Sequence, residues 1–498
     1  MFCFMTSICV SAQVTISGKV DSSDSPVGLP GVNVTVKNEN IGAMTDFDGN
    51  YSIEASSINV TLVFSYIGFK TQEVIVGEDL TVNVTLVEDV SKLDEVVVVG
   101  YGTQSKRNIT GAIASVDLDK ANKNLPNTNV SQSLSTVAGV QFVGDGRPGQ
   151  SGNILIRGQN SLSGDNNPLV VLDGIIFNGS LNDINPQDIA TIDILKDASS
   201  AAIYGSRAAN GVILVTSKKG TTSKPKVSVN LFSGLSESGN EIKLLSPERY
   251  VERRLDYRRA TGQEANPNNI ADYLTTTEAE NYLNGRTTDL WDLISQQGSI
   301  NSVDLNISGR SDNVNYYLSS SFSDNKGLVF NDREKRSTFR ANVDVKLADW
   351  IKAGVNTLFT RRDLSGEEAS IRNAYRSSPL GTFFNEDGSP TQFPVPSEQA
   401  ATNPLWEPSL TDNEDISNNL FSNFYTELNT NFLGGDITYR LNFSPNIRWN
   451  HEYNYIKKDP NVDFNNTSAV KFNRNDYDWL FENFVTYKKD IGEDHSFD

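Results

Sequence analysis

Cysteine is nearly absent from this chain of 498 residues, which contains only Cys3 and Cys9. Histidine is equally rare, with His451 and His495 as its two copies. The sequence also lacks a His-Glu metal motif and a Gly-x-Ser-x-Gly nucleophile elbow. These absences remove the usual means of nucleophilic and metal-assisted catalysis. The sequence therefore predicts that the protein is not an enzyme and has no metal site and no cofactor.

Basic residues are outnumbered, and the formal net charge is -19. A protein that binds nucleic acid needs a basic face to neutralise phosphates, so no nucleic-acid partner is expected. Only 37% of the residues are hydrophobic, and no run approaches the roughly 20 apolar residues of a membrane-spanning helix. Two classes remain, a soluble multi-domain protein and a β-barrel membrane protein. Strands of such a barrel span the bilayer with about 10 residues and are apolar on one face only.

The start of the chain carries an export pattern. Residues 1–10 form a short apolar run that ends in Val10-Ser11-Ala12 and is followed by Gln13. This pattern predicts a signal peptide over residues 1–12, cleaved between Ala12 and Gln13. A buried N-terminal strand is the alternative. Both cysteines lie inside the predicted signal peptide, so the exported chain would have no disulfide or thiol chemistry.

Residues 13–88 alternate between apolar and polar side chains with a period of two, which is typical of half-buried strands. Turn-forming residues at Asp24-Ser25-Pro26 and Leu29-Pro30-Gly31 separate the runs. The pattern predicts a small β-sandwich with strands at 14–20, 32–36, 51–53, 61–66 and 82–86. The cluster Asp46, Asp48 and Gly49 suggests a calcium loop. The later carboxylates of such a loop are missing, however, so a hairpin turn is the stronger interpretation.

Residues 89–104 change in character, because acidic residues lead into four successive valines, Val96 to Val99. β-Branched side chains favour an extended backbone. Glycines and charges on both sides suggest a strand that is not locked inside a domain, and such a strand can add itself to the sheet of another protein. A buried strand of the following domain is the alternative, and the pattern alone favours it.

Residues 105–220 mix short helices with strands and predict an α/β domain. Helical segments are expected at 130–137, 186–189 and 198–204, and strands at 154–158, 169–174, 192–196 and 211–216. The spacing Gly144-x-Gly146-x-x-Gly149 matches a dinucleotide-binding fingerprint, which requires a helix directly after the glycines. Pro148 and Gly152 oppose a helix and a strand follows them, so we expect a plain loop.

Residues 221–498 alternate over longer stretches, as between Phe339 and Leu347. Some turns are very short, whereas residues 236–300 and 361–419 form long loops. Short turns at one end and long loops at the other predict a transmembrane β-barrel. Candidates for its aromatic girdle are Trp350 and Trp449. A soluble β-sandwich also alternates, but it rarely carries such uneven loops.

The order of these segments resembles the SusC/RagA family of TonB-dependent outer-membrane transporters. The most specific similarity is the run from Ile184-Asn185-Pro186-Gln187-Asp188-Ile189 to Ala208-Ala209-Asn210-Gly211-Val212-Ile213, which resembles the plug signature of that family almost residue for residue. The sandwich, with Thr45-Asp46-x-Asp48-Gly49 and Phe64-Ser65-Tyr66-Ile67-Gly68-Phe69, is similar to a carboxypeptidase-regulatory-like domain. The resemblance covers essentially the whole chain, more loosely beyond residue 230.

The resemblance implies a mainly β fold in five parts: a signal peptide (1–12), a carboxypeptidase-regulatory-like β-sandwich (13–88), a TonB-box linker (89–104), a TonB-dependent receptor plug domain (105–220) and a partial transmembrane antiparallel β-barrel (221–498). It identifies the valine run as the TonB box, which the periplasmic protein TonB captures as an added strand. The TonB-binding residues would be Asp94, Glu95, Val96, Val97, Val98 and Val99. The plug-signature residues would be Arg157, Gly158, Asp173, Gly174, Lys196, Asp197, Tyr204, Gly205, Arg207, Asn210 and Gly211. Arg157 and Arg207 are candidates either for a buried ion pair with the barrel or for capping local carbonyl groups.

The implied function is import of an oligosaccharide or oligopeptide across the outer membrane of a Gram-negative, Bacteroidetes-like cell. A SusD-like surface lipoprotein would cover the barrel mouth, outer-membrane lipid would surround the barrel, and the N-terminal domain and TonB box would lie in the periplasm. About eight strands are found between Val227 and Tyr487. An open sheet would leave unpaired edges in lipid, so we expect the first part of a larger barrel. The alternative is a cell-surface adhesin or binding module made of β-sandwich domains, which does not account for the plug signature.

Overall fold

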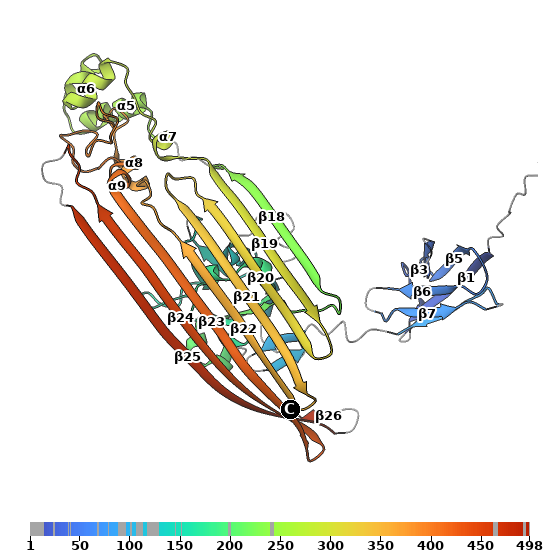
Figure 1. Ribbon diagram of the computed structural model, residues 1–498. Helices are drawn as coiled ribbons and strands as arrows, with labels where there is room; N and C mark the ends of the chain where they lie inside the picture. The colour runs from blue at the N-terminus through green and yellow to red at the C-terminus, as the bar shows by residue number, and fades with distance from the viewer. Residues whose placement is uncertain are drawn as a thin grey trace, which may run out of the picture. The chain divides into compact units, whose positions relative to one another are not determined.

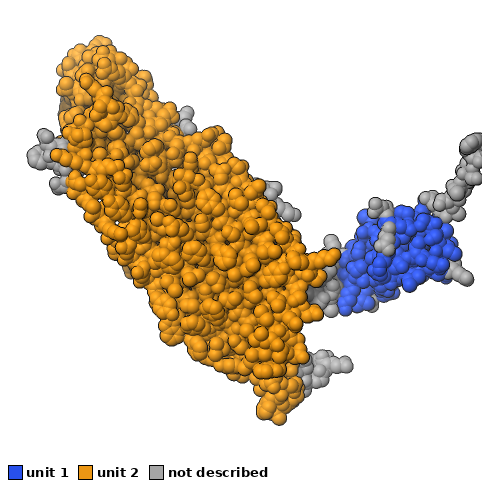
Figure 2. Space-filling model, viewed as in Figure 1, with its two compact units in different colours: residues 1–97, 102–110 blue, residues 98–101, 111–498 orange. Residues whose placement is uncertain are grey.

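The computed structural model divides into two compact units, residues 1–97 with 102–110 and residues 98–101 with 111–498 (Figures 1 and 2). It describes residues 14–22, 25–37, 39, 41–66, 69–77, 79–87, 96–99, 102–105, 113–116, 129–144, 146–150, 152–197, 201–239, 244–461, 467–491 and 495–497. The predicted cleavage site at Ala12 and Gln13 lies outside these residues, as do Asp94 and Glu95 of the predicted TonB box.

The first unit is a β-sandwich of two four-stranded sheets. In one sheet, β1 (Val14–Ser22) pairs with β2 (Ser25–Gly28), β5 (Asn50–Ala55) and β8 (Val84–Leu86). The other has the order β4 (Gly42–Met44), β3 (Asn33–Val36), β6 (Thr61–Ser65) and β7 (Gln72–Ile75). The inward positions are apolar, and Phe64 is fully buried with its ring edge-on to Tyr51 at 5.4 Å between centroids. The predicted sandwich is confirmed.

Three strands of this unit, β2, β4 and β7, have no counterpart among the predicted strands. The turn expected at Asp24-Ser25-Pro26 is wrong from Ser25 onward, because Ser25 and Gly28 pair with the end of β1. Proline is tolerated in β2 because this strand lies at the edge of its sheet. The Asp46 loop is a tight turn, as expected, but it is not a hairpin turn, because the strands that it joins, β4 and β5, belong to different sheets. The Asp46 carboxylate accepts hydrogen bonds from the backbone N–H groups of Asp48 at 3.0 Å and Asn50 at 2.8 Å, which lowers its pKa.

The valine run forms β9 (Val96–Val99), which pairs with β10 (Gly102–Ser105) in a two-stranded sheet. The extended backbone predicted from β-branching is confirmed. The alternative of a strand inside the following domain's sheet is wrong for the described residues, because β9 belongs to neither sheet of the domain described next.

The described residues between 113 and 220 form a domain that we call the plug. Its main sheet has the order β11 (Ile113–Val116), β16 (Ile189–Leu195), β17 (Val212–Ser217), β14 (Leu169–Leu172) and β15 (Ile175–Ile176), with β14 and β17 parallel. A separate hairpin pairs β12 (Val140–Val143) with β13 (Asn153–Ile156). Its loop contains Gly146 and Gly149 with φ of 73° and 70° and no helix among its described residues, as expected for a plain loop.

The plug helices are shorter than the sequence indicates. Helix α3 (Val130–Leu134) ends three residues before the predicted boundary and continues as turns to Gly139, whose φ is 78°. In place of the α-helix expected at 198–204, the described residues form the 3₁₀ segment η4 (Ala202–Ala208). Gly205 breaks this segment with φ of 66° and ψ of -152°, a conformation that only glycine adopts easily.

The described strands between Lys226 and Phe497 form a single antiparallel sheet that we call the wall. Each strand pairs with the next, in the order β18 (Lys226–Ser236), β19 (Gly298–Arg310), β20 (Val314–Lys326), β21 (Arg333–Ala348), β22 (Ile351–Asp363), β23 (Thr411–Phe432), β24 (Gly435–Ile456), β25 (Ser468–Ile491) and β26 (His495–Phe497). The sheet is open, since β18 and β26 stand at its two ends. Figure 1 shows the plug against one face of the wall.

The wall has long connections at one end and short turns at the other (Figure 1). The connection from β18 to β19 contains α5 (Pro247–Ala260), η5 (Pro267–Tyr273), α6 (Thr276–Leu283) and α7 (Leu290–Ile294), and that from β22 to β23 contains α8 (Ile371–Arg376) and α9 (Trp406–Leu410). Helix α6 starts with a capping box of Thr275 and Glu278. None of the described helices is both long and apolar enough to cross a membrane. The predicted unevenness of the loops is confirmed.

The two faces of the wall have opposite chemistry. The face away from the plug exposes apolar side chains, among them Val227, Val229, Leu231, Val303, Leu305, Trp479, Phe481 and Val485. The face toward the plug buries polar and charged side chains, among them Ser319, Ser321, Arg336, Thr338, Arg340, Asn342, Asn356 and Arg362. A water-soluble sheet that packs on a core has the reverse arrangement.

Candidate functional site

The plug segment from Ser180 to Asp188 contacts the wall directly. It consists of two 3₁₀ turns, η2 (Leu181–Asp183) and η3 (Pro186–Asp188). Ser180 and Asp183 form a capping box around η2, and Asn185 caps η3, in which Pro186 takes the first position. These local hydrogen bonds fix the backbone, so the remaining polar atoms of the segment point at the wall. We call this segment the docking segment.

Hydrogen bonds with side chains of five neighbouring wall strands, β19 to β23, hold the docking segment. Tyr317 of β20 donates its hydroxyl to Asp188 at 2.9 Å, and Asn185 donates to Asp304 of β19 at 2.9 Å. Asn419 of β23 donates to the carboxylate of Asp183 at 2.9 Å. These residues are at most 7% exposed, so water competes little for the bonds.

A buried ion pair joins the plug and the wall beside this segment. Arg340 of β21 is 1% exposed and pairs with Asp173, which lies in the turn between β14 and β15. Asp173 also accepts hydrogen bonds from the backbone N–H and the hydroxyl of Ser217, both at 2.8 Å. Asn342 donates to the same hydroxyl at 2.8 Å. We call these contacts and those of the docking segment the seam.

Burial shifts the pKa of one carboxyl group in the docking segment. Desolvation raises the pKa of Asp188, and it outweighs the positive charge of Arg340 and the hydroxyl hydrogen bonds of Ser319 and Tyr317. Asp188 is 1% exposed. Displacement of the plug would bring this group into water and restore its ordinary acidity.

Arg157 requires a correction. We considered it a candidate for a buried ion pair with the barrel, but it pairs with Asp197 on the plug itself and its side chain is 54% exposed. Its φ of 59° and that of Gly158, 103°, turn the chain directly after β13. The buried pair of the described seam has the opposite polarity, with the arginine on the wall and the carboxylate on the plug. Arg207 is not in a buried ion pair of the described residues either, and it donates to the side chain of Asn178 at 2.8 Å.

The remaining signature residues support the plug fold. Lys196 donates to the carbonyl of Ala138 at 2.5 Å, and Asn210 donates to the carbonyl of Asp165 at 2.8 Å. Tyr204 packs in a small buried cluster with Leu169 and Leu214. Positive φ angles at Gly174 (86°) and Gly211 (91°) allow the chain to turn at these points. A Cβ atom at Gly211 would lie 2.7 Å from the Cδ1 atom of Ile156 and 3.0 Å from the carbonyl oxygen of Leu195, so a side chain there would force the end of Ile156 to move.

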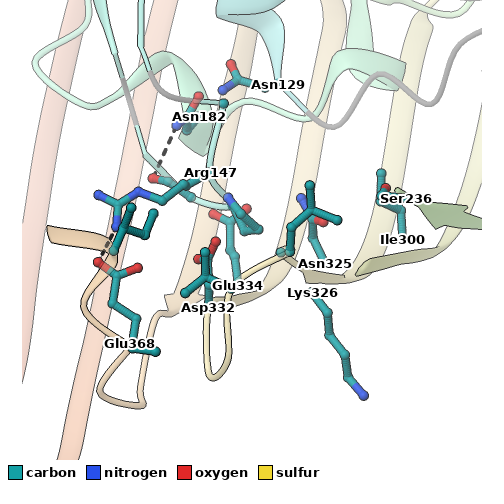
Figure 3. Close-up of a pocket in the computed structure, with 18 of the residues that line it drawn as sticks. Asn129, Arg147, Asn182, Ser236, Ile300, Asn325, Lys326, Asp332, Glu334 and Glu368 are labelled. Carbon is teal, nitrogen blue, oxygen red and sulfur yellow. Dashed lines mark hydrogen bonds and ion pairs between the residues drawn. The ribbon is translucent and has the colours of Figure 1, made fainter. Parts of the chain in front are cut away.

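A cavity of about 1240 Å³ lies beyond the seam, between the plug loop that joins β12 to β13 and the long-loop end of the wall. Arg147 of that loop pairs with Glu368, which follows β22 (Figure 3). Asn182 of the docking segment also lines the cavity, together with Lys326, Asp332, Glu334 and Trp291. A ligand in this cavity would therefore contact the plug, the wall and the long connections at the end of the wall together.

The wall residues of the seam were not among the predicted site residues. The alternation of Phe339 and Leu347 with polar partners does indicate a polar face that contains Arg340 and Asn342. It does not indicate which of these polar residues meets the plug. Asn185 and Asp188 were part of the plug-signature run, but only the structure places them against β19 and β20. No group of three or more His, Cys, Asp or Glu residues within the described ranges could hold a metal ion.

Two family models match the chain. Residues 105–212 match the TonB-dependent Receptor Plug Domain, and residues 16–98 match the CarboxypepD_reg-like domain. The first match contains the docking segment, and the second covers the β-sandwich except for the first two residues of β1.

Relatives match over nearly the whole chain. It is 36% identical to TonB-dependent receptor P26 of Formosa agariphila, over 99% of this chain and 49% of that protein. It is 32% identical to TonB-dependent receptor SusC of Bacteroides thetaiotaomicron, over 89% of this chain and 44% of that protein. The chain thus spans about half the length of the curated relatives that it matches.

Solved structures share the fold. The RagAB peptide importer in its open-open state superposes with a TM-score of 0.66 at 23% identity, covering 81% of this chain and 48% of that chain. The closed-closed state gives a TM-score of 0.65. Sequence similarity across the sandwich, the plug and the wall, together with this shared fold, shows that the chain belongs to the SusC-like TonB-dependent receptors.

Proposed function

We propose that the protein imports a nutrient across the outer membrane, with the plug closing the pore until TonB displaces it. The observation that carries this proposal is the opposite chemistry of the two faces of the wall. The apolar outer face suits lipid, and the polar inner face binds the plug through the seam. In water, so many exposed apolar side chains would promote association.

The proposal divides the chain as the sequence predicts, at residues 12, 88, 104 and 220. The sandwich and β9 would lie in the periplasm, where TonB captures residues 94–99 as an added strand. Support comes from the extended conformation of Val96 to Val99 and from their position outside the plug sheets. Backbone hydrogen bonds in such a pairing need no particular side chains, which is consistent with four successive valines.

The cargo would bind in the cavity between the plug loop and the surface loops. Its size suits an oligomer rather than a single sugar or amino acid, and its lining mixes carboxylates, amides and Trp291. We propose an oligosaccharide or an oligopeptide as the cargo, and a SusD-like lipoprotein as the cover of the long-loop end. Trp350, which is 59% exposed, and Trp449 would belong to the aromatic girdle.

The test uses the full-length gene product in its native cell, with Val97→Pro and Val97→Thr as a matched pair. Proline has no N–H to donate to an added strand, whereas threonine keeps both the N–H and the β-branched shape. We expect outer-membrane fractionation for all three proteins. Uptake of one glycan or peptide source should fall by roughly tenfold or more in the proline variant only.

The alternative hypothesis, a cell-surface adhesin or binding module, predicts a different result. It requires a surface-bound or secreted product and equal growth of both variants on every nutrient tested. That outcome would refute the transport proposal. Loss of uptake in both variants would instead point to a side-chain requirement and refute the added-strand mechanism.

A further inference from the structure

A groove of about 440 Å³ lies on the outer face of the wall, across β19 to β22. In two neighbouring rows of cross-strand partners, one serine replaces a large apolar side chain. Ser320 lies between Leu305 and Phe339. In the next row, Ser337 lies opposite Phe322. Because a serine side chain is small, each serine leaves a hollow between the phenylalanine rings, and the groove has apolar sides.

Two cationic side chains lie next to the groove, on the side of the long connections. Arg361 is the cross-strand partner of Ser337, and Lys335 lies two residues before Ser337 on β21. The neighbours of Arg361 in the chain, Thr360 and Arg362, are buried and donate hydrogen bonds to the plug. Side chains alternate along a strand, so Arg361 points outward. Buried neighbours also flank the lysine, which therefore lies on the same outer face.

No carboxylate of the described residues lies within ion-pair distance of either cation. The two carboxylates opposite the lysine in the sheet have other partners. Asp324 forms an ion pair with Arg333, whose Nε donates to it at 2.7 Å. Asp363 accepts a hydrogen bond from the backbone N–H of Ser365 at 3.0 Å. The outer face thus has two cations without a matching anion beside an apolar groove.

The opposite end of the same strands has no such cations. Its outward positions near the short turns include Tyr316, Val343 and Ala353, which are uncharged. If any polar boundary of the membrane required cations, both ends of the strands would carry them. The two cations occur at the long-loop end, which lies at the cell surface under the proposed function.

We propose that the groove binds a lipid of the outer leaflet that has a phosphate headgroup. An acyl chain would lie between the phenylalanine rings, and the phosphate would accept hydrogen bonds from Arg361 and Lys335. A chain without a charged headgroup accounts for the groove but not for the cations, and a free anion accounts only for the cations. The site lies on the opposite face of the wall from the seam. The inference rests on the proposed function, since it takes this face as the one in contact with lipid.

The first test measures lipid binding to the full-length protein in detergent by native mass spectrometry. The probe is diphosphoryl lipid A, which has phosphate groups and acyl chains, and its dephosphorylated form is the matched control ligand. Lys335→Gln with Arg361→Gln removes both cations. Lys335→Arg with Arg361→Lys keeps both charges. Lys471→Gln removes an exposed cation from β25, three strands away from β22 and outside the groove.

The double glutamine variant should bind diphosphoryl lipid A roughly tenfold or more weakly than the native sequence. The charge-conserving variant and Lys471→Gln should stay within about twofold. Equal binding by the native and the double glutamine proteins would overturn the inference. So would equal binding of the dephosphorylated lipid, because the headgroup would then not be recognised. Competition by inorganic phosphate as strong as that by the lipid would also overturn it, since the groove would then contribute nothing.

A second pair of variants tests the groove itself. Ser337→Phe fills the hollow opposite Phe322, whereas Ser233→Phe adds the same ring at an exposed position of β18 outside the groove. Only Ser337→Phe should weaken lipid binding, by roughly tenfold, because the new ring occupies the place of the acyl chain. Unchanged binding by this variant would exclude the groove as the chain site.

Failure of the proposed function gives a different result. A protein that fractionates with the outer membrane but binds the lipid equally in all variants overturns the lipid site alone. A protein that does not fractionate with the outer membrane overturns the proposed function, and with it the outer leaflet as the source of the lipid.

Discussion

The sandwich and the wall are both built from strands that alternate between apolar and polar residues, but they bury opposite faces of those strands. In the sandwich, alternating strands turn apolar residues such as Phe64 and Ile16 inward and polar residues outward. In the wall, Arg340 and Asn342 face inward and Leu231 and Trp479 face outward. A period of two therefore states only that the two faces of a strand differ. The medium on each side decides which face is the buried one.

The largest difference between the wall and the sandwich is expected in the free-energy cost of breaking an ion pair. Arg340→Met leaves Asp173 buried without its partner, which should cost about 3–5 kcal/mol of plug docking. Lys37→Met removes the exposed pair with Glu73 in the sandwich, where both side chains are nearly half exposed, and should cost about 0–1 kcal/mol of that unit's stability. Hydrogen exchange of residues 173–188 and of residues 33–36 measures the two effects. Equal effects would mean that the seam is open to water.

Replacing an exposed apolar residue by arginine should also change stability by different amounts in the two regions. Leu231 of the wall is 70% exposed and Ile75 of the sandwich is 74% exposed. Leu231→Arg should cost about 2–4 kcal/mol if that side chain contacts lipid near mid-membrane. Ile75→Arg should change stability by no more than about 0.5 kcal/mol. Denaturant titration of the protein in vesicles gives both values, and a neutral Leu231→Arg would argue against a lipid-facing surface.

A smaller contrast concerns glycine. Gly211→Ala combines a φ of 91° with a Cβ position 2.7 Å from Ile156, so it should destabilise the plug by more than about 1 kcal/mol. A Cβ at Gly77 of the sandwich meets nothing within 4 Å, and Gly77→Ala should be neutral or stabilising by up to about 1 kcal/mol. Thermal unfolding, followed by hydrogen exchange, measures the stability of each of the two units separately. A tolerated Gly211→Ala would show that the backbone at residue 211 can leave its positive φ and that the side chain of Ile156 can move aside.

The smallest contrast is in the response to pH. Burial raises the pKa of Asp188, so its contribution to docking is fully present below the ordinary carboxyl value and is lost as the pH rises through the raised pKa. Backbone hydrogen bonds lower the pKa of Asp46, so its contribution is present above the ordinary value and is lost as the pH falls through the lowered pKa. Acidification should therefore tighten the docking segment and loosen the Asp46 turn.

Hydrogen exchange between about pH 7 and pH 3, corrected for the intrinsic rates, tests both directions in one sample. Asp188→Asn and Asp46→Asn should each abolish the pH dependence of their own region only. A parallel response of the two regions would contradict the opposite causes assigned to the two shifts.

Much of the fold follows from the sequence because the evidence for it is local. Alternation predicts the sandwich and eight long wall strands, and the valine run predicts the extended β9. The wrong predictions of secondary structure also have local causes. Strand β2 contains Ser25 and Pro26, which favour a turn, but pairing with β1 outweighs that preference at the sheet edge. The helix expected at 198–204 is instead a 3₁₀ segment in its described part, since Gly205 adopts a conformation that interrupts a helix.

The candidate site followed from the sequence only in part. The docking segment lies within a run that marks the family, yet none of its residues was assigned a contact. Arg157 was considered for the buried pair, which in the described seam is made by Arg340. An arginine on a strand gives no sign of its partner when that partner, Asp173, is 167 residues away in the chain.

The sequence by itself determined the period of each strand, the turns, the order of the segments and the family, because each of these depends on neighbouring residues or on a short specific motif. Only the tertiary structure decided which polar residues of the wall contact the plug, which carboxyl group is buried, and which strand lies at the edge of the plug sheet. These depend on the register and curvature of a sheet that brings distant residues together. The energy of a buried charge, in turn, depends on that three-dimensional environment.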